Sequence, residues 1–217
     1  MPTKILTHPI YSASISHFAF YAQYPSLVCF EMQDTYQKQT LRNRAYIYGA
    51  NGKQALTIPV KHHKKNHNIL YKELLIENTT SWQTQHWKSI VSAYNKSPFF
   101  EYYKDDLQPL YDKKYTHLMA FNLEVTQTYC ELIGIPFPNR STNSYEINYD
   151  KSQYIDIRKQ TQHKKTAPIT LDPYIQVFEQ KHGFLSDLSI LDLLCNEGSN
   201  TLSYLHSICL HTALNAI

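Results

Sequence analysis

The sequence predicts an α+β domain, in which an antiparallel or mixed sheet from the N-terminal half is packed by helices from the middle and C-terminal segments. Two patterns support this prediction. Apolar and polar residues alternate on both sides of Asn51-Gly52, as in a β-hairpin. After Thr80 the apolar residues recur with a period of about 3.6, as in helices. We read residues 1–217 as a single domain with a polar segment at about 136–173, which we expect to be mobile.

The N-terminal half contains the expected strands. A short amphipathic helix is expected from Ser14 to Tyr24, and the apolar run from Ser26 to Phe30 is typical of a buried strand. The alternating residues from Arg44 to Tyr48 and from Leu56 to Val60 form the two arms of the hairpin. Residues Ile69 to Ile76 predict a third strand, which would extend the hairpin into an antiparallel sheet.

The second half is expected to be mainly helical. Helices are expected over residues 81–95, 98–103, 115–133, 190–195 and 200–208, with a short strand over 154–157. Gly134 is placed to end the third of these helices, and Ser189 to cap the fourth. Two polar residues, His86 and Asn122, fall on apolar helix faces. We therefore expect both to point towards the packed side, where the Asn122 amide must find hydrogen-bond partners.

The composition excludes several classes of protein. A formal charge of +3 and an isoelectric point near 8.5 are too mild for a dedicated nucleic-acid-binding protein, so nucleic acid is not the expected partner. The five glycines form neither a G-x-G-x-x-G motif nor a Walker loop, which disfavours dinucleotide-binding and P-loop folds. The sequence leaves the cofactor unknown.

Cysteine usage and the N-terminus predict a cytoplasmic location. The four cysteines lie far apart without a C-x-x-C pair, and residues 1–14 contain no apolar run typical of a signal peptide. No window approaches the about 18 consecutive apolar residues of a membrane helix. We expect no membrane span, so that contact with a lipid-linked substrate would be peripheral.

A dense group of polar residues lies between the expected buried strand and the hairpin. Carboxylates near the end of a strand, followed by guanidinium groups, can orient a nucleophile and bind a phosphate. Glu31 and Asp34 are the candidate acids. The candidate anion-binding residues are Lys38, Arg42, Asn43 and Arg44. The alternative interpretation is a solvated loop with ordinary ion pairs.

Histidine and tyrosine residues supply the other candidates. His86 is the candidate general base, because imidazole transfers protons near neutral pH; the alternative is a hydrogen-bonded packing residue. Tyr94 and Tyr102 are candidates for contact with a sugar ring. His62, His63 and His67 lie in a basic loop without acidic or cysteine ligands close by, so no metal site is expected there.

Five segments give the chain a resemblance to a known family. These are Tyr36-Gln37-Lys38-Gln39-Thr40-Leu41-Arg42-Asn43-Arg44, Leu56-Thr57-Ile58-Pro59-Val60 and Trp82-Gln83-Thr84-Gln85-His86-Trp87, followed by residues 94–103 and 191–198. In order and spacing they resemble the WbqC-like family. The chain departs from the family pattern in two places: His8-Pro9 stands where members commonly carry Gln-Pro, and the paired acids appear as Glu31 and Asp34 with altered spacing.

The resemblance implies a role in bacterial surface-polysaccharide assembly of the O-antigen type. It implies a transferase, with aminoacyl (glycyl) transfer to an amino sugar on a phosphate-bearing carrier as the suggested reaction. The expected partner is then a nucleotide-sugar or a lipid-linked sugar phosphate. Two alternatives stay open: a non-catalytic binding or scaffold protein of the same pathway, and an RNA-binding protein that uses the basic stretches 61–67 and 159–165.

Overall fold

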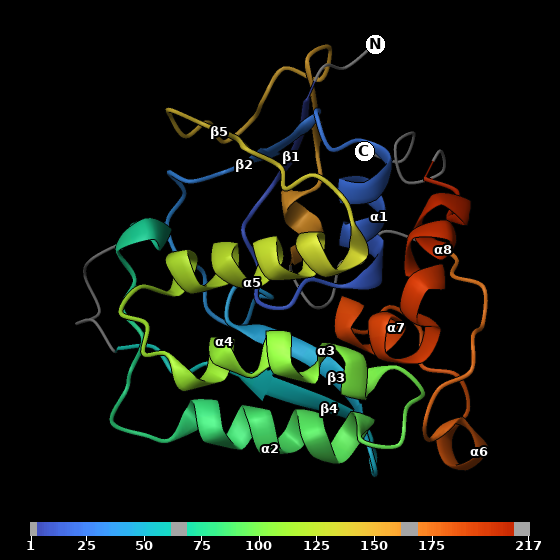
Figure 1. The fold of residues 1–217 in the computed structure, drawn as a ribbon. Helices are drawn as coiled ribbons and strands as arrows, with labels where there is room; N and C mark the ends of the chain where they lie inside the picture. Colours follow the sequence, from blue (N-terminus) through green and yellow to red (C-terminus); the bar gives the residue numbers. More distant parts are fainter. Residues whose placement is uncertain (1–3, 62–68, 162–168, 211–217) are drawn as a thin grey trace.

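The computed structural model describes residues 4–61, 69–161 and 169–210, which form an α+β fold (Figure 1). Its strands fall into two separate sheets. The first contains β1 (Lys4–Thr7), β2 (Val28–Phe30), β5 (Arg140–Ser141) and β6 (Tyr154–Asp156). The second is a hairpin of β3 (Arg44–Gly49) and β4 (Gly52–Thr57).

The first sheet corrects the predicted sheet. Its order is β5-β2-β1-β6, and every neighbouring pair is parallel, so the expectation of an antiparallel or mixed sheet from the N-terminal half is wrong. Helix α1 (Ile15–Gln23) connects β1 to β2, and a helical crossover returns the chain in the same direction. Two of the four strands come from residues 140–156. Strands of two to four residues are too short to reveal their pairing direction by alternation.

The hairpin confirms the prediction around Asn51-Gly52. Arg44 pairs with Thr57 at one end of the hairpin and Gly49 with Gly52 at the other. Gly52 has a φ of 95°, which is accessible to glycine and rare for other residues. The two strands therefore turn back within two residues, as the sequence indicated.

The third strand predicted over residues 69–76 is wrong. Residues Tyr71–Glu73 form a 3-10 helix, and isolated bridges join Leu70, Leu75 and Ile76 to three different segments. Tyr71 is fully buried, with its hydroxyl donating to the carbonyl of Pro9 over 2.6 Å. These tertiary contacts override the local strand pattern.

The helices predicted after Thr80 are found with shifted ends. They are α2 (Trp82–Tyr94), α3 (Phe100–Leu107), α5 (Leu118–Ile133), α7 (Ile190–Glu197) and α8 (Thr201–Ser207). The structure adds elements that were not predicted: the short helices α4 (Pro109–Asp112) and α6 (Glu179–His182), and 3-10 turns at Arg158–Thr161 and Gly198–Asn200. Gly134 ends α5 in the left-handed region, at a φ of 80°. Ser189 caps α7 by accepting a hydrogen bond from the Leu191 N–H. Both predicted end signals are confirmed.

The elements stack so that α5 runs between the parallel sheet and the hairpin (Figure 1). Helix α2 packs along the hairpin on its outer side, while α7 and α8 lie beside α1 (Figure 1). Two loop segments, residues 8–14 after β1 and residues 41–43 before β3, run together in this middle layer. The Tyr11 N–H donates to the Leu41 carbonyl over 3.0 Å. This pairing brings residues from both segments to the candidate site.

Candidate functional site

The carboxyl ends of the parallel strands carry a group of buried charges. Because β1, β2 and β6 are parallel, the residues that follow them meet at one edge of the sheet. His8 follows β1, Glu31 follows β2 and Arg158 lies just after β6. We call His8, Glu31, Asp34, Arg42 and Arg158 the carboxyl-edge cluster. All five side chains are at most 9% exposed.

Three members of this cluster form a triangle of polar atoms. Arg42 Nη2 donates to Asp34 Oδ2 over 2.6 Å and lies 2.7 Å from His8 Nε2, which is 2.9 Å from the same carboxylate oxygen. Arg42 also donates to the Thr35 carbonyl over 2.6 Å, and its guanidinium carbon lies 5.2 Å from the centre of the Tyr71 ring. The guanidinium is thus enclosed by the protein's own groups.

The triangle shifts the pKa values of both titratable members. Burial alone would raise the pKa of Asp34, but the hydrogen bond from His8 and the charge of Arg42 lower it to about 2. Burial lowers the pKa of His8 to about 4, against the opposing hydrogen bond with Asp34. At neutral pH the triangle therefore holds a carboxylate, a guanidinium and a neutral imidazole.

Glu31 is held by a second set of partners. Its two oxygens accept hydrogen bonds from Thr142 Oγ1 and the Tyr149 hydroxyl, each over 2.8 Å, and Arg158 Nη1 lies 3.8 Å away. Arg158 itself pairs with Asp156, with Nη2 2.6 Å from Oδ2. Glu31 and Asp34 are therefore both packed within the protein, each with a different arginine.

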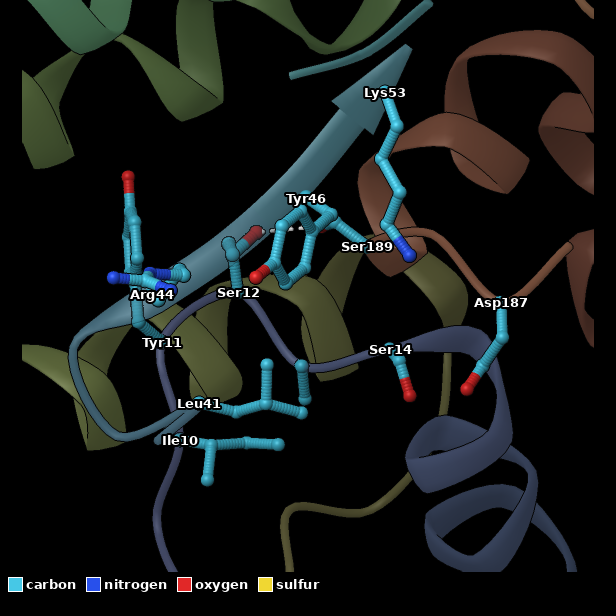
Figure 2. Close-up of a pocket in the computed structure, with 12 residues that line it drawn as sticks. Ile10, Tyr11, Ser12, Ser14, Leu41, Arg44, Tyr46, Lys53, Asp187 and Ser189 are labelled. Carbon is cyan, nitrogen blue, oxygen red and sulfur yellow. Dashed lines mark hydrogen bonds between the residues drawn. The ribbon is translucent and has the colours of Figure 1, made fainter. Parts of the chain in front are cut away.

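A second site opens beside the cluster, between residues 10–14 and the hairpin. We call this space, of about 40 Å³, the hairpin pocket. Hairpin residues and a segment near α7 complete its wall (Figure 2). Its polar lining residues are Ser12, Ser14, Arg44, Tyr46, Lys53, Asp187 and Ser189.

Two cations of the hairpin face this pocket. Arg44 and Tyr46 alternate with buried residues along β3 and so share one face of the hairpin. Lys53 Nζ lies 4.5 Å from the centre of the Tyr46 ring, and Figure 2 shows that ring between Arg44 and Lys53. Arg44 Nε donates to Thr57 Oγ1 over 3.3 Å. Among the residues that the structure describes, neither cation has a carboxylate within 4.0 Å.

Two further lining residues hold unusual backbone conformations. Ser12 has a φ of 42° and Asp187 a φ of 51°, in the left-handed region that residues other than glycine seldom adopt. Ser12 Oγ lies 2.7 Å from Ser189 Oγ and 3.0 Å from the Tyr129 hydroxyl. Asp187 accepts two hydrogen bonds from Ser16. Backbone strain of this kind gathers at functional sites more often than elsewhere.

His86 is buried, as its helix face predicted, within a group of aromatic rings. Its Nδ1 lies 3.0 Å from the Tyr11 hydroxyl, and its ring packs edge-on against Trp82 at 5.2 Å. Burial lowers its pKa to about 4, opposed by a hydrogen bond with the backbone of Thr57. Tyr11 separates His86 from the hairpin pocket, which Tyr11 itself lines.

Comparison with known proteins identifies the family to which the chain belongs. A family model described as WbqC-like protein family matches residues 14–167. The chain belongs to the WbqC-like family. Over 194 residues, 78% of this chain and 83% of the relative, the WbqC-like chain is 26% identical to "Uncharacterized protein Rv1507c" of Mycobacterium tuberculosis. No solved structure gave a significant match.

The structure distributes the predicted binding residues of this WbqC-like chain over several places. Arg44 lines the hairpin pocket, whereas Arg42 lies in the carboxyl-edge cluster. Asn43 is buried and donates to the Ile58 carbonyl over 2.9 Å, and Lys38 is exposed in the preceding loop. Tyr94 is fully buried and accepts a hydrogen bond from the Tyr48 N–H, while Tyr102 is 78% exposed on α3.

Several residues of the two sites were missed from the sequence. Those in the cluster are His8 and Arg158, together with Tyr149, which donates a hydrogen bond to Glu31. Those in the pocket are Ser12, Ser14, Tyr46, Lys53 and Asp187. One signal was available: His8 stands where WbqC-like proteins commonly carry Gln, directly before Pro9. The others come from segments far apart in the chain, and only the fold brings them together.

Two predictions fall partly or wholly outside the described residues. The histidines at 62, 63 and 67 lie there, as do most of the basic stretches 61–67 and 159–165 that carried the RNA-binding alternative. Within the described part of the WbqC-like chain, no helix has the length and apolar character needed to cross a membrane.

Proposed function

We propose that this WbqC-like chain is a transferase of surface-glycan assembly, which holds a phosphate-bearing amino sugar in the hairpin pocket and acylates it. The observation that carries the proposal is the pair of cations that face one pocket. Arg44 and Lys53 have no carboxylate within 4.0 Å among the described residues, so their charge is available to an anion from outside. Membership of the WbqC-like family is the support for a role in surface-glycan assembly. The two cations of the pocket are the support for a phosphate-bearing ligand.

A phosphate matches the two cations in charge and geometry. A phosphate monoester carries about −1.5 to −2 charges near neutral pH, which the two cations together offset. The guanidinium of Arg44 presents a planar set of donors, while the ammonium of Lys53 acts as a point charge. The serine hydroxyls at 12 and 14 add neutral hydrogen-bonding groups on the opposite wall.

The remaining lining includes a side chain that suits a sugar ring. Tyr46 offers an aromatic ring between the two cations, and such rings pack against sugars. The pocket volume of about 40 Å³ has room for little more than a phosphate group. The rest of a nucleotide or lipid carrier would then lie outside the pocket.

Thermal unfolding with added ligand tests this proposal. Glucosamine 1-phosphate and UDP-N-acetylglucosamine are expected to raise the unfolding temperature in a concentration-dependent manner. Arg44→Ala and Lys53→Ala should each weaken the affinity by about tenfold or more, because each removes a charged hydrogen-bond donor.

Lys88→Ala is the matched control, since Lys88 is an exposed cation on α2 outside the pocket. It removes the same charge from the protein and should leave the ligand affinity unchanged. The proposal fails if neither ligand stabilises the protein, or if Lys88→Ala weakens binding as much as the two pocket variants do.

A further inference from the structure

The first turn of α1 is capped by a distant residue. Ser14 occupies the N-cap position, where a serine hydroxyl ordinarily accepts a hydrogen bond from an N–H of the first turn. The Ser16 N–H donates instead to Asp187 Oδ1 over 2.9 Å. The Ser14 hydroxyl is thereby released from capping, and Ser14 lines the hairpin pocket together with Asp187 (Figure 2).

The released hydroxyl joins a chain of four polar side chains. Ser14 Oγ lies 3.0 Å from His17 Nδ1 and 2.9 Å from Ser16 Oγ. Ser16 Oγ donates to Asp187 Oδ2 over 3.0 Å. Ser14 and Asp187 line the pocket, whereas Ser16 and His17 do not. His17 is 2% exposed and Ser16 is 7% exposed, so both lie behind the pocket wall.

The positions of the hydrogens follow from the donors available. A carboxylate only accepts, so the single hydroxyl hydrogen of Ser16 points to Asp187. Ser14 then donates to Ser16, and the contact with His17 requires a hydrogen on Nδ1. Burial lowers the pKa of His17 to about 4, so the ring is neutral at pH 7 and carries that one hydrogen.

The environment of His17 Nε2 is consistent with a ring that carries its hydrogen on Nδ1. His17 Nε2 is buried and has no hydrogen-bond partner among the described residues. An unprotonated nitrogen is less costly to leave unpaired than a buried N–H. The hydrogen bonds therefore run in one direction, from His17 through Ser14 and Ser16 to Asp187.

We propose that Ser14 is the nucleophile of a covalent acyl transfer, with Ser16 relaying its proton to Asp187. With an acyl thioester as donor, Ser14 Oγ attacks the carbonyl carbon while its proton moves to Ser16 Oγ and the Ser16 proton moves to Asp187. The His17 N–H stabilises the developing charge on Ser14 Oγ. The carbon–sulfur bond breaks, and the thiolate leaves as a thiol with the proton from Asp187.

In a second step the acyl group leaves Ser14, and the protons move along the same path in reverse. An acceptor amine attacks the ester carbonyl and forms an amide, and its proton reaches Asp187. The same proton returns through Ser16 to Ser14 Oγ as the ester bond breaks, which restores the starting hydroxyl. The identity of the acceptor as an amino sugar phosphate rests on the proposed function, whereas acylation of Ser14 does not.

A fluorophosphonate probe, which phosphonylates activated serines, tests the nucleophile directly. Peptide mass spectrometry should locate the probe on Ser14 of the wild-type protein. Ser14→Ala should abolish labelling, and Asp187→Asn should slow it by about 100-fold, in the range of general-base effects. Asp187→Asn keeps an oxygen for the Ser16 N–H, so the cap and the unfolding temperature should be retained.

Ser92→Ala is the matched control. Ser92 is an exposed serine on α2 that does not line the pocket, so Ser14 in this variant should be labelled at the wild-type rate. The absence of label on Ser14 in folded wild-type protein overturns the proposal, as does labelling of Asp187→Asn at the wild-type rate. Glucosamine 1-phosphate binding to Ser14→Ala, measured separately, shows whether the pocket proposal stands when the nucleophile proposal fails.

Discussion

Arg42 and Asp34 form an ion pair of 2.6 Å in which the two side chains are 2% and 5% exposed. Each residue lies close to a wall of the hairpin pocket: Arg42 comes two residues before Arg44, and Asp34 bonds to His8, two residues before Ile10. Asn122 of α5 also donates to the Arg42 carbonyl over 2.6 Å. We infer that the pair fixes the two walls relative to each other.

Arg42→Met is expected to destabilise the protein strongly. The substitution leaves the Asp34 carboxylate buried with only His8 and Thr35 beside it, and removing one partner of a buried ion pair costs about 3–5 kcal/mol. Urea unfolding at pH 7 measures the change. Arg140→Met, at an exposed position on β5, should change the free energy of unfolding far less. Equal small losses for both variants would show that the pair does not fix this region.

The buried histidines should make the protein less stable in acid. The pKa values of His8, His17 and His86 are each lowered to about 4 from an unfolded value of 6.5, with burial as the main cause. Between these values the unfolded chain binds protons that the folded chain does not. Above pH 6.5 the histidines therefore do not reduce the free energy of unfolding. As the pH drops from 6.5 towards 4, the free energy of unfolding falls by up to about 3 kcal/mol per histidine.

His8→Gln removes the part of this pH dependence that comes from His8. Glutamine is the residue that the family commonly carries before this proline, and it does not titrate. Urea unfolding at pH 7.5 and pH 4.5 should show a smaller difference for His8→Gln than for the wild type. His206→Gln, at an exposed position, should leave the difference unchanged. A wild-type pH dependence in His8→Gln would mean that His8 is protonated in the folded protein.

His86→Phe separates a packing role from a catalytic one. The change removes the contact between His86 Nδ1 and the Tyr11 hydroxyl, which should cost about 1–3 kcal/mol of stability. Affinity for glucosamine 1-phosphate should be retained, because Tyr11 lies between His86 and the pocket. Lost binding or turnover at unchanged stability would instead place His86 in the site as a base.

Gly198→Ala tests the packing of the C-terminal helices. A Cβ at this position would lie 2.5 Å from the Phe99 ring, and the φ of 54° is unfavourable for alanine. Crowding of a packed core costs about 1–3 kcal/mol in addition to the backbone strain. Gly134→Ala is the control, since its Cβ meets no atom within 4 Å among the described residues and its φ is also positive. Similar losses for both variants would show that Gly198 is not closely packed against Phe99.

Local signals predicted the elements whose structure is set locally. Asn51-Gly52, Gly134 and Ser189 each specify a turn or a helix end within a few residues, and all three positions are confirmed. Residues 69–76 differ because their conformation depends on Tyr71, which packs against Arg42, a residue about 30 positions earlier in the chain. No local pattern contains that contact.

The site was only partly predictable for the same reason. Arg42 and Arg44 were predicted together as anion-binding residues, but the structure places them in different sites. The chain enters β3 at Arg44, so Arg44 follows the face of the hairpin while Arg42 remains in the preceding loop and turns inward to Asp34. Asp187 reaches the pocket only because α7 packs near α1.

Chemical-shift mapping with glucosamine 1-phosphate shows directly whether the hairpin pocket binds the ligand. In ¹H–¹⁵N spectra of the labelled protein, we expect shifts at residues 10–14, 44–46, 53 and 187, which line the hairpin pocket. The same residues should stay unshifted in the Arg44→Ala, Lys53→Ala double variant. Shifts centred on His8, Glu31 and Arg158, or no shifts at any ligand concentration, would mean that the pocket is not the binding site.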